Sequence, residues 1–368
     1  MHTNILGYLS NHSMPAIGVT YPYNEIDGLV FAVFSFAPIG PDIRRRSGGL
    51  TLDPIGKTMG SLSEALIDRE NNDLLNERFG FSINGSYGRH LLFFSHIAEN
   101  NRYKDIKITD FSYNNDGPCQ FSAFTFEIGK GEYLIAYRGT DDSLEGWYES
   151  IKLFEENPPS RQLAVDYLRS EMKKNKGSYR LVGHSKGGHL ALGAAIMSDL
   201  EQKINIRSVI NFDGPGFTKK FIEKQYKNIL LVQHKMYRFS PADALVSSIL
   251  FGQDIMYYEK NIRYVKPYGY KTPPGQHLYF NWAIYETNKF KPAPRSKLSI
   301  LFQETAVKYH DLYSPGELVR ILDQLYAQSG ELYKGADNRL NRFDILSIFL
   351  GMAIKLLPLR KEYNGPVC

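Results

Sequence analysis

Residues 180–192 read RLVGHSKGGHLAL, and this segment predicts more of the architecture than any other part of the chain. The apolar run at residues 179–182 is typical of a buried strand, and a helical pattern follows Gly188 and continues to Met197. A single serine, Ser185, lies at the turn between them. We therefore expect a strand, a tight turn and a helix with Ser185 at the apex.

Ser185 is the candidate nucleophile. A serine at such a turn stands above the edge of a parallel sheet in a strained backbone conformation, which tolerates only small residues two positions before and two after it. Gly183 and Gly187 occupy these positions. The start of the next helix directs free N–H groups toward the serine, and these favour an oxyanion there. The alternative is an ordinary glycine-rich turn, but the small residues that follow the serine favour the catalytic interpretation.

Strand and helix patterns alternate through the middle of the chain. The predicted strands cover residues 106–113, 120–128, 132–137, 179–182, 206–212, 235–239 and 261–265. The predicted helices of this region cover residues 144–154, 161–174 and 217–226. This alternation predicts an α/β fold with a doubly wound, mostly parallel central sheet flanked by helices.

Helical patterns precede and follow this region. Before it we expect helices at residues 25–36, with Asn24 as N-cap, at 62–77 and at 88–100. After a basic, proline-containing linker at 289–297 we expect helices at 298–309, 314–329 and 342–357. The chain thus divides into an N-terminal helical layer at 1–104, a catalytic core at 105–290 and a C-terminal helical extension at 291–368.

Composition excludes several classes of protein. The 368 residues are 43% hydrophobic and 23% charged, as in a folded globular protein. The net charge of +5 is small and the basic residues are scattered, so no nucleic-acid-binding surface is predicted. The two cysteines, Cys119 and Cys368, lie far apart, which predicts neither a disulfide framework nor a metal site. No cofactor is expected, and oligomeric state is not encoded in any pattern.

The sequence carries no targeting signal that we can identify. Residues 1–14 contain neither a basic leader nor an apolar core of a signal peptide, which favours a cytoplasmic protein, with leaderless export as the alternative. The longest apolar stretch, residues 345–359, is interrupted by Lys355 and Pro358 and is too short to span a bilayer. It is interpreted as a packed helix, the alternative being peripheral contact with a membrane surface.

A nucleophilic serine needs a histidine as general base and a carboxylate that orients this histidine. His277 is the expected base because it follows the last predicted strand, whereas His234 and His310 lie in or near helices. In this type of sheet the order along the chain is serine, acid, histidine. Asp213 and Asp243 each follow a strand, and we favour Asp243 because its strand comes later.

The oxyanion requires two hydrogen-bond donors. The N–H of Lys186 is one by position, since it follows the nucleophile. The second is expected from the loop after an earlier strand, where Thr140 offers an N–H and a hydroxyl. The alternative role for Thr140 is a helix N-cap.

Four motifs together resemble the Mbeg1-like family, a branch of the α/β-hydrolases similar to the class 3, fungal-type lipases. They are YRGTDD at 137–142, GHSKGG at 183–188, NFDGPGF at 211–217 and QH at 276–277. The resemblance implies a serine lipase or esterase with nucleophile Ser185, acid Asp243 and base His277. It also places Thr140 at the oxyanion position of class 3 lipases. His189 and Leu278 stand where an asparagine and an acidic residue are expected, so substrate preference is left open.

Two classes of function follow from these residues. The first is a serine hydrolase that cleaves carboxylic esters through an acyl-enzyme, with acyl-lipid or phospholipid esters as the substrates that the resemblance implies. A soluble short-chain esterase or thioesterase is a variant of this function. The second is a catalytically silent hydrolase scaffold used for binding, since fold alone does not fix function.

Overall fold

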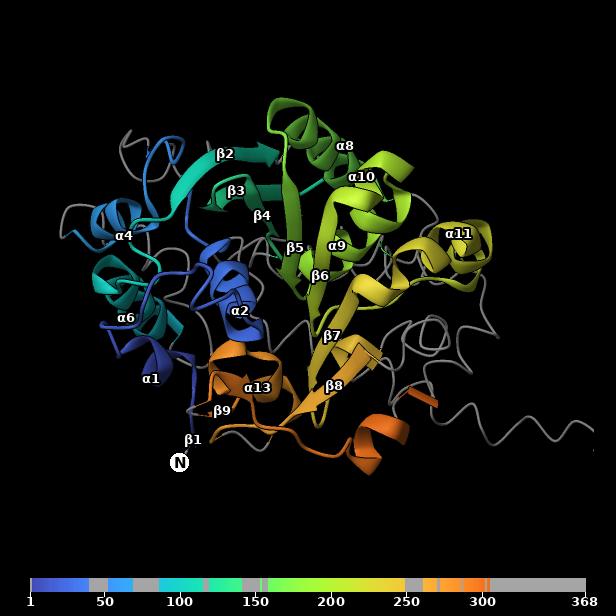
Figure 1. Cartoon of the computed structure of the whole chain (residues 1–368). Helices are drawn as coiled ribbons and strands as arrows, with labels where there is room; N and C mark the ends of the chain where they lie inside the picture. Colours follow the sequence, from blue (N-terminus) through green and yellow to red (C-terminus); the bar gives the residue numbers. More distant parts are fainter. Residues whose placement is uncertain are drawn as a thin grey trace, which may run out of the picture.

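The computed structural model describes residues 2–39, 52–68, 86–114, 119–140, 153, 158–248, 261–269, 272–285, 287–301 and 303–304. Its centre is a seven-stranded sheet (Figure 1). In spatial order the strands are β2 (Lys107–Asn114), β3 (Phe121–Gly129), β4 (Glu132–Tyr137), β5 (Ser178–His184), β6 (Ile206–Phe212), β7 (Met236–Pro241) and β8 (Ile262–Val265). β3 is antiparallel to both of its neighbours, β2 and β4, and β4 to β8 are all parallel. The predicted mostly parallel sheet is therefore confirmed.

Loop length explains where the sheet changes direction. The β3–β4 hairpin closes through Gly131, whose φ of 69° lies in the left-handed region that glycine adopts without strain. Parallel neighbours need longer crossovers, and helices supply them. In the described residues, the crossovers between β4 and β7 contain α8 (Pro159–Lys174), α9 (Lys186–Met197), α10 (Leu200–Asn205) and α11 (Lys219–Val232). The carboxyl ends of β4 to β7 consequently meet along one edge of the sheet.

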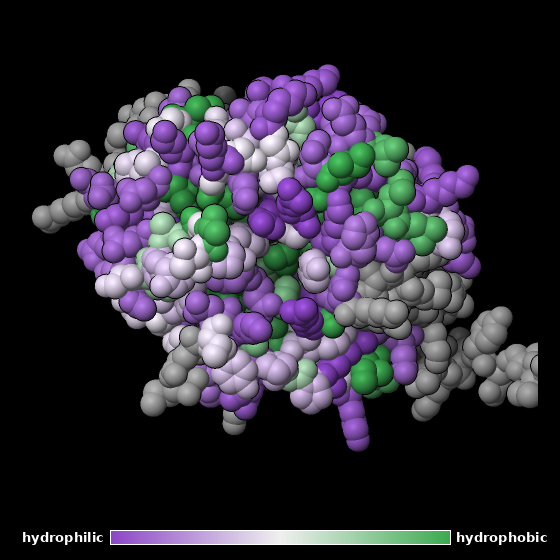
Figure 2. Space-filling view, in the orientation of Figure 1, coloured by the Kyte–Doolittle hydropathy of each residue, from purple (hydrophilic) through white to green (hydrophobic). Residues whose placement is uncertain are grey.

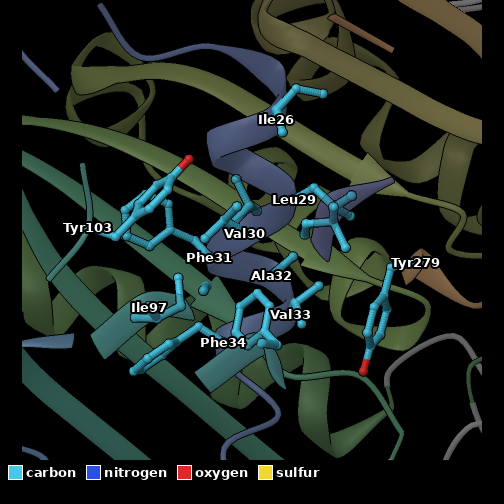
Figure 3. Packing of buried hydrophobic residues seen from close by; sticks show 14 of the residues in the cluster. Ile26, Leu29, Val30, Phe31, Ala32, Val33, Phe34, Ile97, Tyr103 and Tyr279 are labelled. Atoms are coloured by element: carbon cyan, nitrogen blue, oxygen red, sulfur yellow. The ribbon is translucent and has the colours of Figure 1, made fainter. Parts of the chain in front are cut away.

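The two faces of the sheet are covered by different helices because neighbouring residues of a strand point to opposite sides. Ile135, Leu181 and Val209 pack in one cluster with apolar side chains of α8, α9 and α11. Ala136 and Val182 pack on the other side with α2 (Glu25–Phe34). Every residue of α2 after Glu25 is buried, and Figure 3 shows its side chains among those of the surrounding elements. The predicted all-round apolar helix is thus the inner layer of that face.

The N-terminal strand pairs with a strand that lies close to the other end of the described chain. A small antiparallel sheet joins β1 (His2–Thr3), β9 (Ile284–Tyr285) and β10 (Lys289–Phe290) in the order β1–β9–β10. The short helix α1 (Ile5–Leu9) follows β1, and α4 (Met59–Ile67) packs with α6 (Ser86–Glu99) farther along (Figure 1). Ile5 and Phe290, near the two ends of the described chain, therefore belong to the same buried apolar cluster as α2.

Several predicted helices differ from the structure at their ends. The helix expected at 62–77 begins earlier, at Met59, and α11 continues to Val232 rather than ending at residue 226. The helices expected at 144–154, apart from Leu153, and at 314–329 and 342–357 lie outside the described residues. In the described ranges no helix has the length and apolarity needed to cross a membrane.

A buried ion pair joins α2 to Arg102 within the N-terminal layer. Asn24 caps α2, and its backbone N–H donates to Asp27. Arg102 donates from Nε and Nη2 to the two oxygens of Asp27, both at 2.7 Å, and the Tyr103 hydroxyl donates to Oδ1 at 2.6 Å. Asp27 is fully buried and Arg102 is 5% exposed. These four hydrogen-bond donors compensate for the desolvation of the buried Asp27 carboxylate.

We predict that Asp27→Asn destabilises the protein by about 3–5 kcal/mol, because it leaves the Arg102 guanidinium as an uncompensated buried charge. The measurement is urea denaturation followed by tryptophan fluorescence. Asp166→Asn is the matched control: Asp166 pairs with Arg169 on the exposed face of α8, and exposed pairs contribute about 0–1 kcal/mol. Equal shifts for the two variants would contradict the role given to the buried pair.

Candidate active site

The backbone is strained at Ser185, between β5 and α9. β5 ends at His184 and α9 begins at Lys186, so the turn consists of a single residue. Ser185 has φ 57° and ψ −130°, a conformation that costs a non-glycine residue about 1–3 kcal/mol. Its N–H donates to the carbonyl of Phe212 at the end of β6, at 2.9 Å. The predicted turn is present, but the helix begins directly after the serine rather than after Gly188.

Two glycines make this turn possible because no side chain fits at their positions. A Cβ on Gly183 would lie 2.2 Å from the carbonyl carbon of Gly187. A Cβ on Gly187 would lie 2.1 Å from the backbone oxygen of Tyr137, at the end of β4. Both obstacles are backbone atoms, which a rotamer change cannot move. The small residues that the sequence places around Ser185 are therefore a steric requirement.

We predict that Gly187→Ala lowers stability by at least about 1–3 kcal/mol, the usual range for overpacking, because the new methyl group must displace β4 or α9. Gly18→Ala is the control, since a Cβ there meets no atom within 4 Å. Thermal unfolding of the two variants beside the parent protein is the measurement. A Gly187→Ala variant as stable as Gly18→Ala would show that the turn has more room than the structure gives it.

His277 follows the last strand of the central sheet, as predicted, and is the final residue of a one-turn helix, α13 (Pro273–His277). Such a short helix leaves its last carbonyls without helical partners, and side chains supply the donors. Asn281 Nδ2 donates to the Gly275 oxygen at 2.6 Å, and Trp282 Nε1 donates to the Gln276 oxygen at 2.8 Å. His184 Nε2 donates to the His277 oxygen at 2.8 Å. Three consecutive carbonyls are thereby fixed.

His184 connects this helix to the serine. It directly precedes Ser185, and its ring lies against that of His277 with centroids 4.6 Å apart. Because a carbonyl oxygen only accepts, His184 carries its proton on Nε2 in this contact. The His184 side chain is 3% exposed and also packs edge-on against Tyr279. The structure therefore brings His277 beside the turn that carries Ser185.

The carboxylate on His277 is Asp213. His277 Nδ1 donates to Asp213 Oδ2 at 2.6 Å, and Asp213 is fully buried. Asp243, the acid favoured from sequence, instead contacts Gln276. This corrects the expectation that Asp243 is the partner of His277. The physical reason is the strand order: Asp213 follows β6, which is the direct neighbour of β5, whereas Asp243 follows β7, one strand farther from the serine.

The turn after β6 holds Asp213 in a second strained conformation, with φ 50°. Asn211, fully buried on β6, accepts from the Gly214 N–H at 2.7 Å and closes this turn. A Cβ on Gly214 would lie 2.2 Å from the backbone oxygen of Ser185. The aspartate turn therefore packs directly against the serine turn, and the sequence DG is needed for that approach.

Of the two predicted oxyanion donors, Lys186 directly follows the serine and Thr140 follows a residue that lies close to it. Lys186 is the first residue of α9, where N–H groups have no partner within the helix. Its side chain is buried, and Nζ donates to the Gln120 backbone oxygen at 2.8 Å. Thr140 ends the described part of the loop after β4, next to Gly139, whose Cβ would lie 3.5 Å from Ser185 Cβ. Their roles in catalysis stay predictions.

His189 is part of a buried contact that sequence reasoning missed. Burial, aided by the nearby Arg161 cation, lowers the pKa of His189 well below its usual value, so the ring is neutral. Its Nδ1 donates to the Gly216 oxygen at 2.8 Å, and Arg161 Nη2 donates to Nε2 at 2.8 Å. Burial also lowers the pKa of Arg161, to about 9. A histidine here thus ties α8 and α9 to the loop that carries Asp213.

The other candidate ligands and bases are elsewhere. His234 lies in an exposed helical turn at Gln233–Lys235, and His310 is outside the described residues. Cys119 is buried. In the part of the chain that the structure describes, no group of three or more His, Cys, Asp or Glu side chains could hold a metal ion.

A mostly parallel sheet with a strained serine between a strand and a helix, an aspartate after the next strand and a histidine beyond the last strand defines the α/β-hydrolase fold. The model of the Mbeg1-like family matches residues 97–327, and the chain belongs to this family. No curated protein sequence matches the chain.

Several lipases of known structure show a distant likeness to the chain. M37 lipase shares 16% identity over 61% of this chain and 69% of its own, with a TM-score of 0.34. Lipase II from Rhizopus niveus shares 13% over 61% and 86%, with a TM-score of 0.32. The lipase from Rhizopus microsporus var. chinensis shares 14% over 69% and 91%, with a TM-score of 0.30.

Proposed function

We propose that the protein is a serine hydrolase of carboxylic esters, with Ser185 as nucleophile, His277 as base and Asp213 as acid. The observation that carries the proposal is the 2.6 Å contact between His277 Nδ1 and buried Asp213, on a histidine whose ring packs against the residue before Ser185. A histidine with a purely structural role would need neither a buried carboxylate partner nor a strained serine nearby. The strain at Ser185 has the same implication, since outliers of this kind persist where function depends on them.

The contacts of His277 define its part in the reaction. Asp213 accepts a hydrogen bond from the Nδ1–H group, so the lone pair of the neutral ring is on Nε2. Nε2 takes the Ser185 proton as the hydroxyl oxygen attacks the ester carbonyl, and Asp213 stabilises the imidazolium that forms. His277 then protonates the leaving alkoxide, and the acyl group remains on Ser185. Water, deprotonated by His277, attacks the acyl-enzyme, and the carboxylic acid leaves as His277 returns this proton to the Ser185 oxygen.

The negative charge of the tetrahedral intermediates needs donors that are already in place. The N–H of Lys186 at the start of α9 and the N–H or hydroxyl of Thr140 fit this role by position. The contact between Lys186 Nζ and Gln120 supports it, because it fixes the first residue of α9 relative to β3.

Acyl-lipid or phospholipid esters are the proposed substrates, on the basis of the family resemblance. Apolar side chains that are exposed to solvent support contact with a lipid surface. Figure 2 shows them over α10 and α11, where Leu200 and Ile204 are 61% and 69% exposed and Leu230 and Leu231 are also exposed. Surface apolar residues that gather in this way mark interaction sites more often than isolated ones do. A soluble short-chain esterase or thioesterase would use the same catalytic residues.

Substitution of the three residues tests the proposal. We predict that Ser185→Ala removes turnover of a p-nitrophenyl ester and that Asp213→Asn lowers kcat by about 10⁴-fold, because the amide stabilises the wrong tautomer of His277. Asp243→Asn is expected to be far milder. Circular dichroism spectra of the variants check that each one folds.

Two outcomes would contradict this proposal. Full turnover by Ser185→Ala would exclude the assigned nucleophile, and absence of turnover of esters of any chain length by the folded parent protein would favour the silent scaffold.

The same ester measured below and above its micellar concentration separates the substrate classes. A sharp rise above that concentration favours a lipid-surface enzyme, and saturation on monomers favours the soluble esterase.

A further inference from the structure

We propose that Asp243 is a positioning residue for His277, acting through the side chain of Gln276. This inference rests on the proposed function, since it assigns Asp243 a role in the same reaction. The hydrogen bonds of Asp243 go to Gln276, the residue that directly precedes His277.

The contact between the two residues is reciprocal. Gln276 Nε2 donates to Asp243 Oδ2 at 2.6 Å, and the backbone N–H of Asp243 donates to Gln276 Oε1 at 3.1 Å. The first bond is charge-assisted, which makes it stronger than one between neutral groups. Gln276 is 2% exposed, so its amide depends on partners within the protein. Both ends of the amide are used, which fixes the orientation of the side chain.

Because of the strand order, the contact between Asp243 and Gln276 helps to fix the position of His277. β6 and β7 are neighbours, and each is followed by an aspartate: Asp213 holds the His277 side chain, and Asp243 holds that of Gln276. The backbone between these two side chains belongs to the single turn of α13. Two carboxylates on adjacent strand ends thus fix successive residues of one short helix, and together they define where the imidazole lies.

Loss of Asp243 should therefore change catalysis without removing a reacting group. The buried Gln276 amide would lose its charge-assisted bond to Asp243, and α13 would turn or shift in response. A misplacement of about 1 Å at a catalytic group can cost roughly 10²-fold in rate. Because substrate does not touch Asp243 in this scheme, the loss falls on kcat and not on KM.

The test compares Asp243→Ala, Asp243→Asn and Asp213→Asn in the full chain, with p-nitrophenyl butyrate as substrate. We expect Asp243→Ala to lower kcat about 10- to 100-fold with little change in KM. Asp243→Asn should recover most of this loss, because its side-chain oxygen can still accept from Gln276. Asp166→Ala is the matched control: Asp166 also accepts from a glutamine, Gln162, at 3.1 Å, but on the exposed surface of α8. It should leave kcat unchanged.

A double-mutant cycle examines the route through Gln276. If the two residues act as a unit, Gln276→Leu combined with Asp243→Ala should cost no more than the larger single effect. Additive losses would overturn the proposal. An Asp243→Ala variant with the kcat of the parent would also overturn it. Losses in Asp243→Asn as large as those in Asp213→Asn would show instead that Asp243 is the acid.

A readout that does not need turnover separates this inference from the proposed function. The proton between His277 and Asp213 is expected as a low-field NMR resonance that disappears in Asp213→Asn. Asp243→Ala should broaden or shift this resonance, whereas Asp166→Ala should not. A shifted resonance in a protein that cleaves no ester would contradict the proposed function and support the positioning contact. An unshifted resonance in a protein that cleaves esters would support the proposed function and contradict the positioning contact.

Discussion

The site depends on close contact between backbone segments around Ser185. The turn after β5 touches the end of β4 through Gly187 and the turn after β6 through Gly214, and at neither position is there room for a Cβ. Ser185 is held in its strained conformation by these contacts and by the bond from its N–H to Phe212. Strain of this kind persists only where the surroundings over-determine the backbone, which here are the parallel strands β4, β5 and β6.

The polar residues of the site follow from the same strand order. Side chains at the carboxyl ends of neighbouring parallel strands lie close together, and this brings Asp213 to His277 and Asp243 to Gln276. The opposite face of the sheet contributes through α2. Phe36, just after this helix, packs against the rings of His184 and Tyr279, so the N-terminal layer supports the histidine from behind. The buried pair of Asp27 and Arg102 holds that layer in place.

Local patterns in the sequence were sufficient for the mostly parallel sheet and the serine turn. The apolar runs gave β4 and β6 to the residue, and the small residues beside Ser185 predicted the tight approach that the structure contains. The partner of His277 could not be obtained in this way, because both candidate aspartates follow strands and only the spatial order separates them. His184 was also missed: its role depends on the His277 carbonyl, 93 residues away in the chain. The DG turn after β6 was the one local signal that favoured Asp213.

The central claim is that Ser185 is an activated nucleophile held by this architecture. Its most direct test is peptide mapping by mass spectrometry after the folded protein reacts with a fluorophosphonate. The account predicts one covalent adduct per chain, on the peptide that contains Ser185, and no adduct on protein unfolded in urea before the reaction. An adduct on another serine, or none on the folded protein, would contradict it.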